Sequence, residues 1–204
     1  PLGASSINKD AIRLMLKKTI VFVLLLLMFF VASRSFFKSE FFYVHDFTQG
    51  ARIVEMSNAL REGHFPVRWS SNFGFGYGMP LFEFYAPLPY YVGSLFYLVG
   101  FSLVNSIKIL FLISTFVTLI GGYKLGKILF GRGWGLVLAV TLTLAPYRAV
   151  NLFVRGAISE LWGIMALPFI LYGIVGIIKN KKRTSYYKRV RLFFNLDLML
   201  LSLN

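Results

Sequence analysis

Long apolar runs separated by short polar segments are the main pattern along this chain. The runs cover residues 19–33, 88–103, 107–123, 133–146 and 161–178. Because a helix needs about 20 mostly apolar residues to cross the hydrocarbon core of a membrane, the pattern predicts a polytopic, all-α helical membrane bundle. A content of 57% hydrophobic residues and a mean hydropathy of +0.68 agree with this fold class.

The longest polar segment, residues 38–87, is predicted to form a long first external loop that contains amphipathic helices. Within it, residues 47–62 place apolar side chains at helical spacing, at Ile53, Met56 and Leu60. Three charged residues of this helix, Arg52, Glu55 and Arg61, are predicted to point away from the apolar face. Such a helix lies on a membrane surface rather than across the membrane.

Basic residues gather beside the apolar runs and determine the predicted orientation. The net charge is +14, with clusters in residues 9–18, 124–132 and 179–191. Lys and Arg accumulate on the cytoplasmic side of membrane proteins and suit anionic membrane lipids there. We therefore expect a multi-pass protein of the cell (plasma) membrane with a cytoplasmic N-terminus. No nucleic-acid-binding module is visible, so nucleic acid is excluded as a partner.

The charge pattern divides the chain into segments with different predicted positions. They are a basic cytoplasmic N-terminus (1–18), a membrane module (19–178), a basic cytoplasmic loop (179–191) and the start of a truncated further span (192–204). The membrane module consists of a first span (19–37), the external loop (38–87) and embedded or spanning helices (88–178). Keeping residues 124–132 in the cytoplasm requires the run 88–103 to be embedded without a full crossing.

Acidic residues are few, and most of them lie in the first loop. The chain has eight, of which five fall within residues 34–86: Glu40, Asp46, Glu55, Glu62 and Glu83. Because carboxylates are costly beside lipid, acids gathered in one loop of a membrane protein indicate a function there. Asp46 has two interpretations. It is either a helix N-cap with Gln49 completing a capping box, or a general base or metal ligand at the membrane boundary.

Arginines and glycines of the polar segments are further candidates for substrate binding. Arg68, Arg148 and Arg155 suit a phosphate clamp, since a guanidinium matches phosphate geometry, although such residues also snorkel to the membrane interface. The run Gly-Phe-Gly-Tyr-Gly (residues 74–78) is interpreted as an irregular loop that forms a flexible lip over a lipid-linked substrate. Glu160 opens the last apolar run, where the helix dipole favours an acid.

Several motifs follow one another in a fixed order between residues 42 and 178. They are His45-Asp46, Ala51-Arg52, Leu60-Arg-Glu-Gly-His-Phe-Pro-Val-Arg-Trp69, Gly76-Tyr-Gly-Met-Pro-Leu-Phe82, Phe84-Tyr-Ala-Pro-Leu-Pro-Tyr-Tyr91 and Ala145-Pro-Tyr-Arg-Ala-Val-Asn-Leu-Phe-Val-Arg-Gly-Ala-Ile-Ser-Glu160. With these motifs the chain resembles bacterial and archaeal membrane proteins labelled 6-pyruvoyl-tetrahydropterin synthase-related, which belong with the GT-C glycosyltransferases. The resemblance covers a GT-C-like N-terminal module.

The resemblance implies transfer of a sugar from a polyprenyl-phosphate-linked donor to an acceptor at the external membrane face. It implies Asp46 as the catalytic carboxylate, and it allows a divalent cation, Mg²⁺ or Mn²⁺, that Asp46 would ligate. Asn151 stands where family members commonly have a second acid. The residues expected to bind substrate are His45, Arg52, Arg68, Tyr77, Glu83, Tyr85, Arg148, Asn151, Arg155 and Glu160.

Two non-catalytic functions are alternatives to this enzyme. A transporter or flippase for lipid-linked glycans would carry ionisable residues near the membrane midplane and inverted repeats. An assembly subunit would use the aromatic run of the first loop as an interface. The position of the acids in loops and the lack of a visible repeat favour the enzyme. Because a GT-C enzyme has further spans, we expect these residues to be inactive alone.

Overall fold

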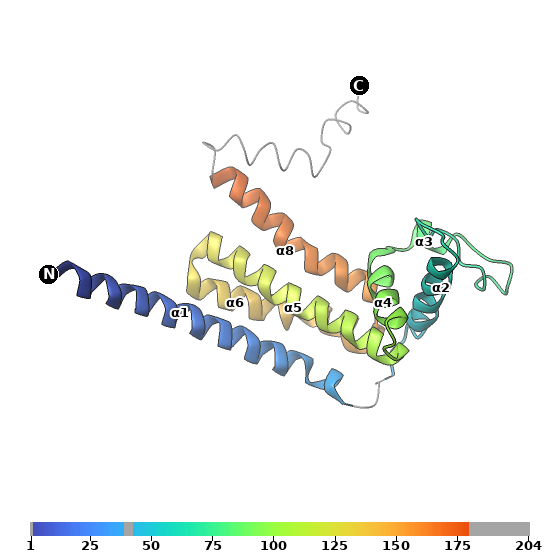
Figure 1. Cartoon of the computed structure of the whole chain (residues 1–204), viewed down its shortest axis with the longest axis horizontal. Coiled ribbons are helices and arrows are strands. Elements are labelled where there is room, and N and C mark those ends of the chain that lie inside the picture. Colours follow the sequence, from blue (N-terminus) through green and yellow to red (C-terminus); the bar gives the residue numbers. More distant parts are fainter. Residues whose placement is uncertain (1, 39–42, 180–204) are drawn as a thin grey trace, which may run out of the picture.

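The computed structural model describes residues 2–38 and 43–179, which form a bundle of helices (Figure 1). In chain order the elements are α1 (Leu2–Ser33), η1 (Arg34–Phe37), α2 (Gln49–Arg61), α3 (Leu81–Phe84), α4 (Leu88–Leu98), α5 (Leu103–Phe130), α6 (Arg132–Thr143), α7 (Pro146–Val150), η2 (Asn151–Arg155) and α8 (Ile158–Lys179). Extended pairing within the described residues is limited to one isolated bridge between Ser70 and Met79. The all-α helical membrane bundle is confirmed. The segment 192–204, predicted to begin a further span, lies outside the described residues.

Among the described residues, three helical stretches are long and apolar enough to cross a membrane: Ile12–Phe37, Leu103–Phe130 and Ile158–Lys179. The pair Arg132–Thr143 and Pro146–Arg155 is bent by 42° and adds a fourth crossing if it is counted as one span. Helix α4 has 11 residues and so rises about 16 Å, roughly half of the ~30 Å hydrocarbon core. This length suits the embedded helix predicted for the run 88–103, whereas the orientation in the membrane stays a prediction.

Helix α5 is the centre of the bundle, and it packs against α6 and α8. Its contact with α6 depends on small residues. A Cβ on Gly122 would lie 2.9 Å from the Cα of Ala139, and a Cβ on Gly126 would lie 2.7 Å from the carbonyl oxygen of Trp134. Two glycines four residues apart let helix backbones approach closely, as in many membrane bundles.

The first loop covers the end of the bundle at which α5 begins (Figure 1). Helix α2 packs on α4 and on α5, and it buries Ile53 and Met56 in a core that also contains Tyr90 and Leu110. The helix predicted for residues 47–62 is therefore present. It begins at Gln49 and ends at Arg61, where Gly63 follows with a φ of +82°.

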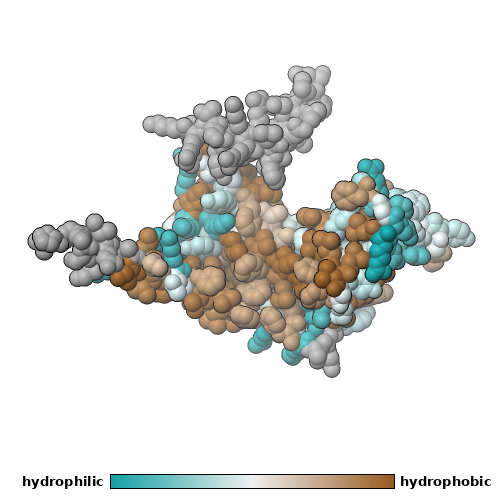
Figure 2. All heavy atoms as spheres, in the orientation of Figure 1, coloured by the Kyte–Doolittle hydropathy of each residue, from teal (hydrophilic) through white to brown (hydrophobic). Residues whose placement is uncertain are grey.

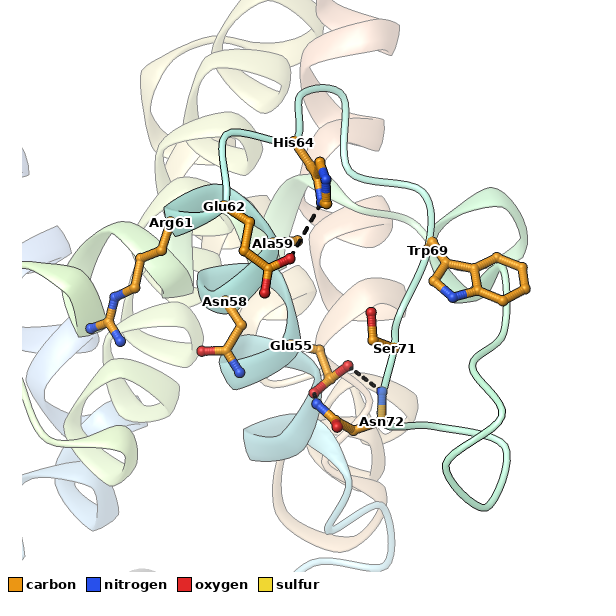
Figure 3. Close-up of a pocket in the computed structure, with 9 residues that line it drawn as sticks. All are labelled: Glu55, Asn58, Ala59, Arg61, Glu62, His64, Trp69, Ser71 and Asn72. Carbon is orange, nitrogen blue, oxygen red and sulfur yellow. Dashed lines mark hydrogen bonds and ion pairs between the residues drawn. The ribbon is translucent and has the colours of Figure 1, made fainter.

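Two of the charged residues predicted to point away from the apolar face of α2 contact polar groups of other segments and are shielded from solvent. Glu55 is only 7% exposed. Its Oε2 accepts hydrogen bonds from Ser70 Oγ (2.7 Å) and the Asn72 backbone N–H (3.0 Å), and its Oε1 accepts one from Asn72 Nδ2 (2.6 Å). The side chain of Arg52 is 12% exposed. Residues 70–72 fold back over α2 and supply hydrogen-bond donors to Glu55 (Figure 3). Helical periodicity within residues 47–62 cannot predict this contact.

The attachment of residues 70–72 to Glu55 is expected to weaken in acid. Burial raises the pKa of Glu55, but the hydrogen bonds from Asn72 and Ser70 outweigh burial and hold the pKa below its usual value of 4.5. Because the folded-state pKa is the lower one, this stabilisation is present above pH 4.5 and is lost as the pH falls through the folded-state pKa. Rate-corrected hydrogen exchange should show the Asn72 amide losing protection in that acid range.

Two substitutions test the Glu55 attachment. Glu55→Gln should lower protection of the Asn72 amide at neutral pH and remove the acid transition, because glutamine does not titrate. Glu62→Gln is the matched control, since the side chain of Glu62 is 62% exposed. The control should keep the transition. An acid transition that persists in Glu55→Gln would contradict the assignment.

Candidate functional site

A polar cleft of about 510 Å³ lies between the first loop and the segment that links α6 to α8. It is lined by His45, Asp46, Thr48, Arg52, Tyr85, Arg155, Ala157, Ser159 and Glu160. Most of the residues predicted to form a site therefore meet here, although they come from separate parts of the chain. Asn151 lies directly behind the lining, where it contacts Arg155 and Glu160.

Hydrogen bonds to backbone carbonyls attach the first loop to the segment after α7. The backbone N–H of His45 donates to the carbonyl oxygen of Val154 (2.8 Å), and that of Asp46 donates to the carbonyl oxygen of Arg155 (2.9 Å). Gln49 Nε2 adds a bond of 2.8 Å to the carbonyl oxygen of Gly156, 107 residues away in sequence. Residues Asn151–Arg155 form a π-helical turn, a feature that often occurs at functional sites. Asp46 is thus held in place by backbone contacts.

The Asp46 carboxylate accepts three side-chain hydrogen bonds. Its Oδ1 accepts from Thr48 Oγ1 (2.6 Å), and its Oδ2 accepts from Gln49 Nε2 (2.8 Å) and from Arg52 Nη1 (3.0 Å). The N-cap of α2 is Thr48, which makes no side-chain capping bond, so the predicted capping box at Asp46 is wrong. An ionised carboxylate has about four acceptor positions, and three are taken. One position on Oδ1 is left for a group in the cleft.

Arg52 belongs to a buried network behind Asp46. Its guanidinium carbon lies 4.1 Å from the centroid of the Tyr85 ring, and its Nη1 also donates to Tyr90 Oη (3.3 Å). Tyr90 is fully buried and donates to Gln49 Oε1 (2.7 Å), while Ser159 Oγ donates to Tyr90 Oη (3.3 Å). Sequence reasoning assigned no role to Tyr90 or Ser159. The only signals were the motifs that contain them, residues 84–91 for Tyr90 and residues 145–160 for Ser159.

Glu160 and Arg155 form the second polar cluster of the cleft. Glu160 Oε1 accepts from Asn151 Nδ2 (3.0 Å) and from the Tyr147 hydroxyl, and its Oε2 accepts from Arg155 Nη1 (2.8 Å). Arg155 Nη1 also donates to Asn151 Oδ1 (2.6 Å). Asn151 is fully buried, whereas the side chain of Arg155 is 47% exposed. Arg155 is therefore the more accessible of the two guanidinium groups in the cleft.

Three predicted site residues of the first loop do not line the cleft. Arg68 Nε pairs with Glu83 Oε1 at 3.1 Å, and both side chains are largely exposed. Tyr77 is 90% exposed in the glycine-rich loop. The structure therefore does not bring these residues to Asp46.

Arg148 is buried inside the bundle, where it is only 2% exposed. Its Nη2 donates to Thr115 Oγ1 (2.8 Å) and its Nη1 donates to the carbonyl oxygen of Thr143 (3.2 Å). These bonds link α5 to the end of α6. The position of Arg148 suits a structural contact between helices, and its guanidinium does not line the cleft.

The side chains around Asp46 do not provide the ligands that the divalent cation allowed by the resemblance would need. Among the described residues there is no group of three His, Asp or Glu side chains that can hold a metal ion. Mg²⁺ requires close to six oxygen ligands, whereas the Asp46 carboxylate is paired with the Arg52 guanidinium at 3.0 Å. Glu40 lies outside the described residues. We therefore assign no chemical step to a metal ion.

A second cavity, of about 270 Å³, lies beside α2 and shares no lining residue with the Asp46 cleft. Figure 3 shows its side chains, with Trp69 turned away from α2 and His64 directed at Glu62. His64 Nδ1 and Glu62 Oε2 are 3.5 Å apart, and both side chains are exposed. Its buried carboxylate, Glu55, accepts three hydrogen bonds from Ser70 and Asn72, which attach residues 70–72 to α2, so a structural role accounts for this group.

No protein-family model matches this chain, and neither the curated proteins nor the solved structures contain a significant match. The fold and the cleft define a helical membrane protein with a polar site at one end of its bundle. Function is inferred from that site and from the two separate motifs, residues 45–46 and 145–160, that meet in it.

Proposed function

We propose that this protein is a membrane glycosyltransferase of the GT-C type. It would transfer a sugar from a polyprenyl-phosphate donor to an acceptor at the external membrane face. One observation carries the proposal: the Asp46 N–H donates to the carbonyl oxygen of Arg155 at 2.9 Å. This contact joins the catalytic carboxylate expected from the resemblance to the motif of residues 145–160, far away in sequence.

The polar groups of the cleft suit a single displacement at the anomeric carbon of the sugar. The acceptor hydroxyl hydrogen-bonds to the remaining acceptor position on Asp46 Oδ1. As its oxygen bonds to the anomeric carbon, its proton passes to Asp46 and the bond from that carbon to the phosphate oxygen breaks. The polyprenyl phosphate leaves with the electron pair, and the accessible guanidinium of Arg155 stabilises its charge. Arg52 and Gln49 hold the Asp46 carboxylate in position.

The surface around the bundle supports a lipid-linked donor. Figure 2 shows the hydrophobic side of the bundle next to the hydrophilic surface of the first loop. A polyprenyl-phosphate sugar needs both environments, because its phosphate and sugar are polar and its chain is apolar. The cleft lies at this end of the bundle, so the polyprenyl chain can extend along the helices while the phosphate meets Arg155.

The test uses the full-length protein reconstituted in liposomes with a set of polyprenyl-phosphate sugars. Mass spectrometry should show consumption of one donor and release of an equal amount of polyprenyl phosphate. Passage of an intact lipid-linked sugar across the bilayer, without consumption, would replace the proposal with the flippase. If no donor is consumed and none crosses the bilayer, the result contradicts both the glycosyltransferase and the flippase and favours an assembly subunit.

A further inference from the structure

Helix α5 ends at the opposite end of the bundle from the first loop (Figure 1). A second cleft, of about 410 Å³, lies beside this end of α5. It is lined by Leu25, Ile120, Tyr123, Lys124, Lys127, Ile128 and Tyr172, which belong to α1, α5 and α8. None of these residues lines the Asp46 cleft. Whatever this site binds is therefore separate from the proposed transfer reaction.

The mouth of this cleft is cationic. Lys124 and Lys127 are exposed, and their Nζ atoms lie 5.6 Å from the Phe169 ring and 5.9 Å from the Tyr123 ring. Lys179 Nζ reaches the carbonyl oxygen of Ile128 beside them. Three basic groups therefore meet at one point of the bundle.

No carboxylate among the described side chains neutralises these lysines. The sequence has no Asp or Glu from residue 84 to 159 or from residue 161 to 179. The carboxylates with described side chains are Asp46, Glu55, Glu62, Glu83 and Glu160. Four of them belong to the first loop with its helices α2 and α3, and Glu160 belongs to the first turn of α8, so all five lie at the other end of the bundle. On α1, Asp10 precedes Leu25 by about four helical turns. The cleft therefore has an excess of positive charge that suits an external anion.

The walls of the cleft are apolar and continue into the outer faces of the helices. Leu25 and Ile120 face it from α1 and α5, and only 11% of the α1 span and 17% of the α8 span are buried within the bundle. Tyr123 and Tyr172 are partly buried in the cleft, and Trp134, at the same end, is 60% exposed. Tyr and Trp concentrate at the level of lipid headgroups. The cleft thus combines a cationic, aromatic mouth with a lipid-facing wall.

We propose that this cleft binds one anionic phospholipid. The phosphate of the headgroup lies between Lys124 and Lys127, in the cleft that Tyr123 and Tyr172 also line, and one acyl chain lies along Leu25 and Ile120. Basic pockets between membrane helices bind acidic headgroups in this way. The apolar wall distinguishes a lipid from free phosphate, which would gain nothing from Leu25 or Ile120.

The test is native mass spectrometry of the full-length protein taken from bilayers with equal amounts of phosphatidylglycerol and phosphatidylcholine. The protein should retain phosphatidylglycerol in preference. Each lysine near an anionic headgroup contributes about fivefold in affinity, so Lys124→Gln with Lys127→Gln should lower retention about 25-fold. The matched control is Lys17→Gln with Lys18→Gln, which removes the same charge from exposed residues of α1 and should change retention less than about threefold.

A further variant separates a lipid from a free anion. Ile120→Trp fills the apolar part of the cleft but keeps both lysines, and it should lower phosphatidylglycerol retention as strongly as the lysine pair does. Two results together would show a phosphate site and overturn the proposal. Inorganic phosphate would stabilise the natural protein and Ile120→Trp equally against heat, and Ile120→Trp would retain as much lipid as the natural protein. Equal losses in the two lysine pairs would also overturn it, because they would show binding by general surface charge.

Discussion

Replacing Asp46 with Asn is expected to lower sugar transfer at least about a thousandfold, within the range that a positioned general base contributes. An amide has the shape of the carboxylate but cannot accept the proton of the acceptor hydroxyl. The phosphate-binding side of the cleft should be little changed, because Arg155 is held by Asn151 and Glu160 rather than by Asp46. We expect kcat to fall while the Kd for the donor changes less than about fivefold. The measurements are initial rates in liposomes and donor binding.

A control must separate loss of chemistry from loss of charge in the first loop. Glu62→Gln removes a carboxylate of the same loop whose side chain is 62% exposed and does not line the cleft. Its transfer rate should stay within about twofold of the natural protein, since surface substitutions have small effects. Asp46→Asn must also unfold at nearly the same temperature. Full transfer activity in a correctly folded Asp46→Asn protein would refute the catalytic assignment.

Gly156→Ala is expected to destabilise the contact between the two halves of the site by about 3 kcal/mol. Gly156 has a φ of +68°, in the left-handed region that costs an L-residue about 1–2 kcal/mol. An added Cβ would also lie 2.8 Å from Cγ2 of Val44, which is 5% exposed and cannot move into solvent. The amides of His45 and Asp46 should lose hydrogen-exchange protection, because their acceptors lie directly before Gly156.

A second glycine provides the matched control for Gly156. Gly63 has a φ of +82°, but nothing lies within 4 Å of an added Cβ. Gly63→Ala should therefore cost only the backbone strain, about 1–2 kcal/mol. Combining Gly156→Ala with Val44→Ala should recover part of the loss, since the clash is removed. If Gly156→Ala costs no more than Gly63→Ala, the tight contact between Val44 and Gly156 is absent.

The boundaries of α5 show the limit of reading helices from apolar runs. The run 107–123 predicts the core of this helix, but α5 extends from Leu103 to Phe130 and includes Lys124 and Lys127. Hydropathy locates only the part of a helix that can lie in lipid. The helix itself extends beyond its apolar part for as long as its backbone hydrogen bonds continue. By contrast, the run 133–146 matches α6 closely, because Pro146 at its end begins a new helix that is bent by 42° from α6.

The site shows which residues require a tertiary structure. Asp46, Arg52, Arg155 and Glu160 are recognisable from motifs, because their residue types and order are local properties of the sequence. Nothing in those motifs shows that Arg148 is turned into the bundle while Arg155, seven residues later, faces the cleft. That difference depends on the π-helical turn between them, which changes the angular spacing of the side chains.

The sequence by itself determined that this protein is a bundle of apolar helices with a polar first loop and a single strong acidic candidate in Asp46. These features follow from hydrophobicity and helical periodicity, which act over a few residues. Only the tertiary structure decided that Glu55 is buried, that Tyr90 connects Gln49 with Arg52, and that Asp46 lies against Arg155. Each of these contacts joins residues 15 to 109 positions apart in sequence. Such a contact forms only when the helices pack, because polar groups that become buried must then form hydrogen bonds with one another.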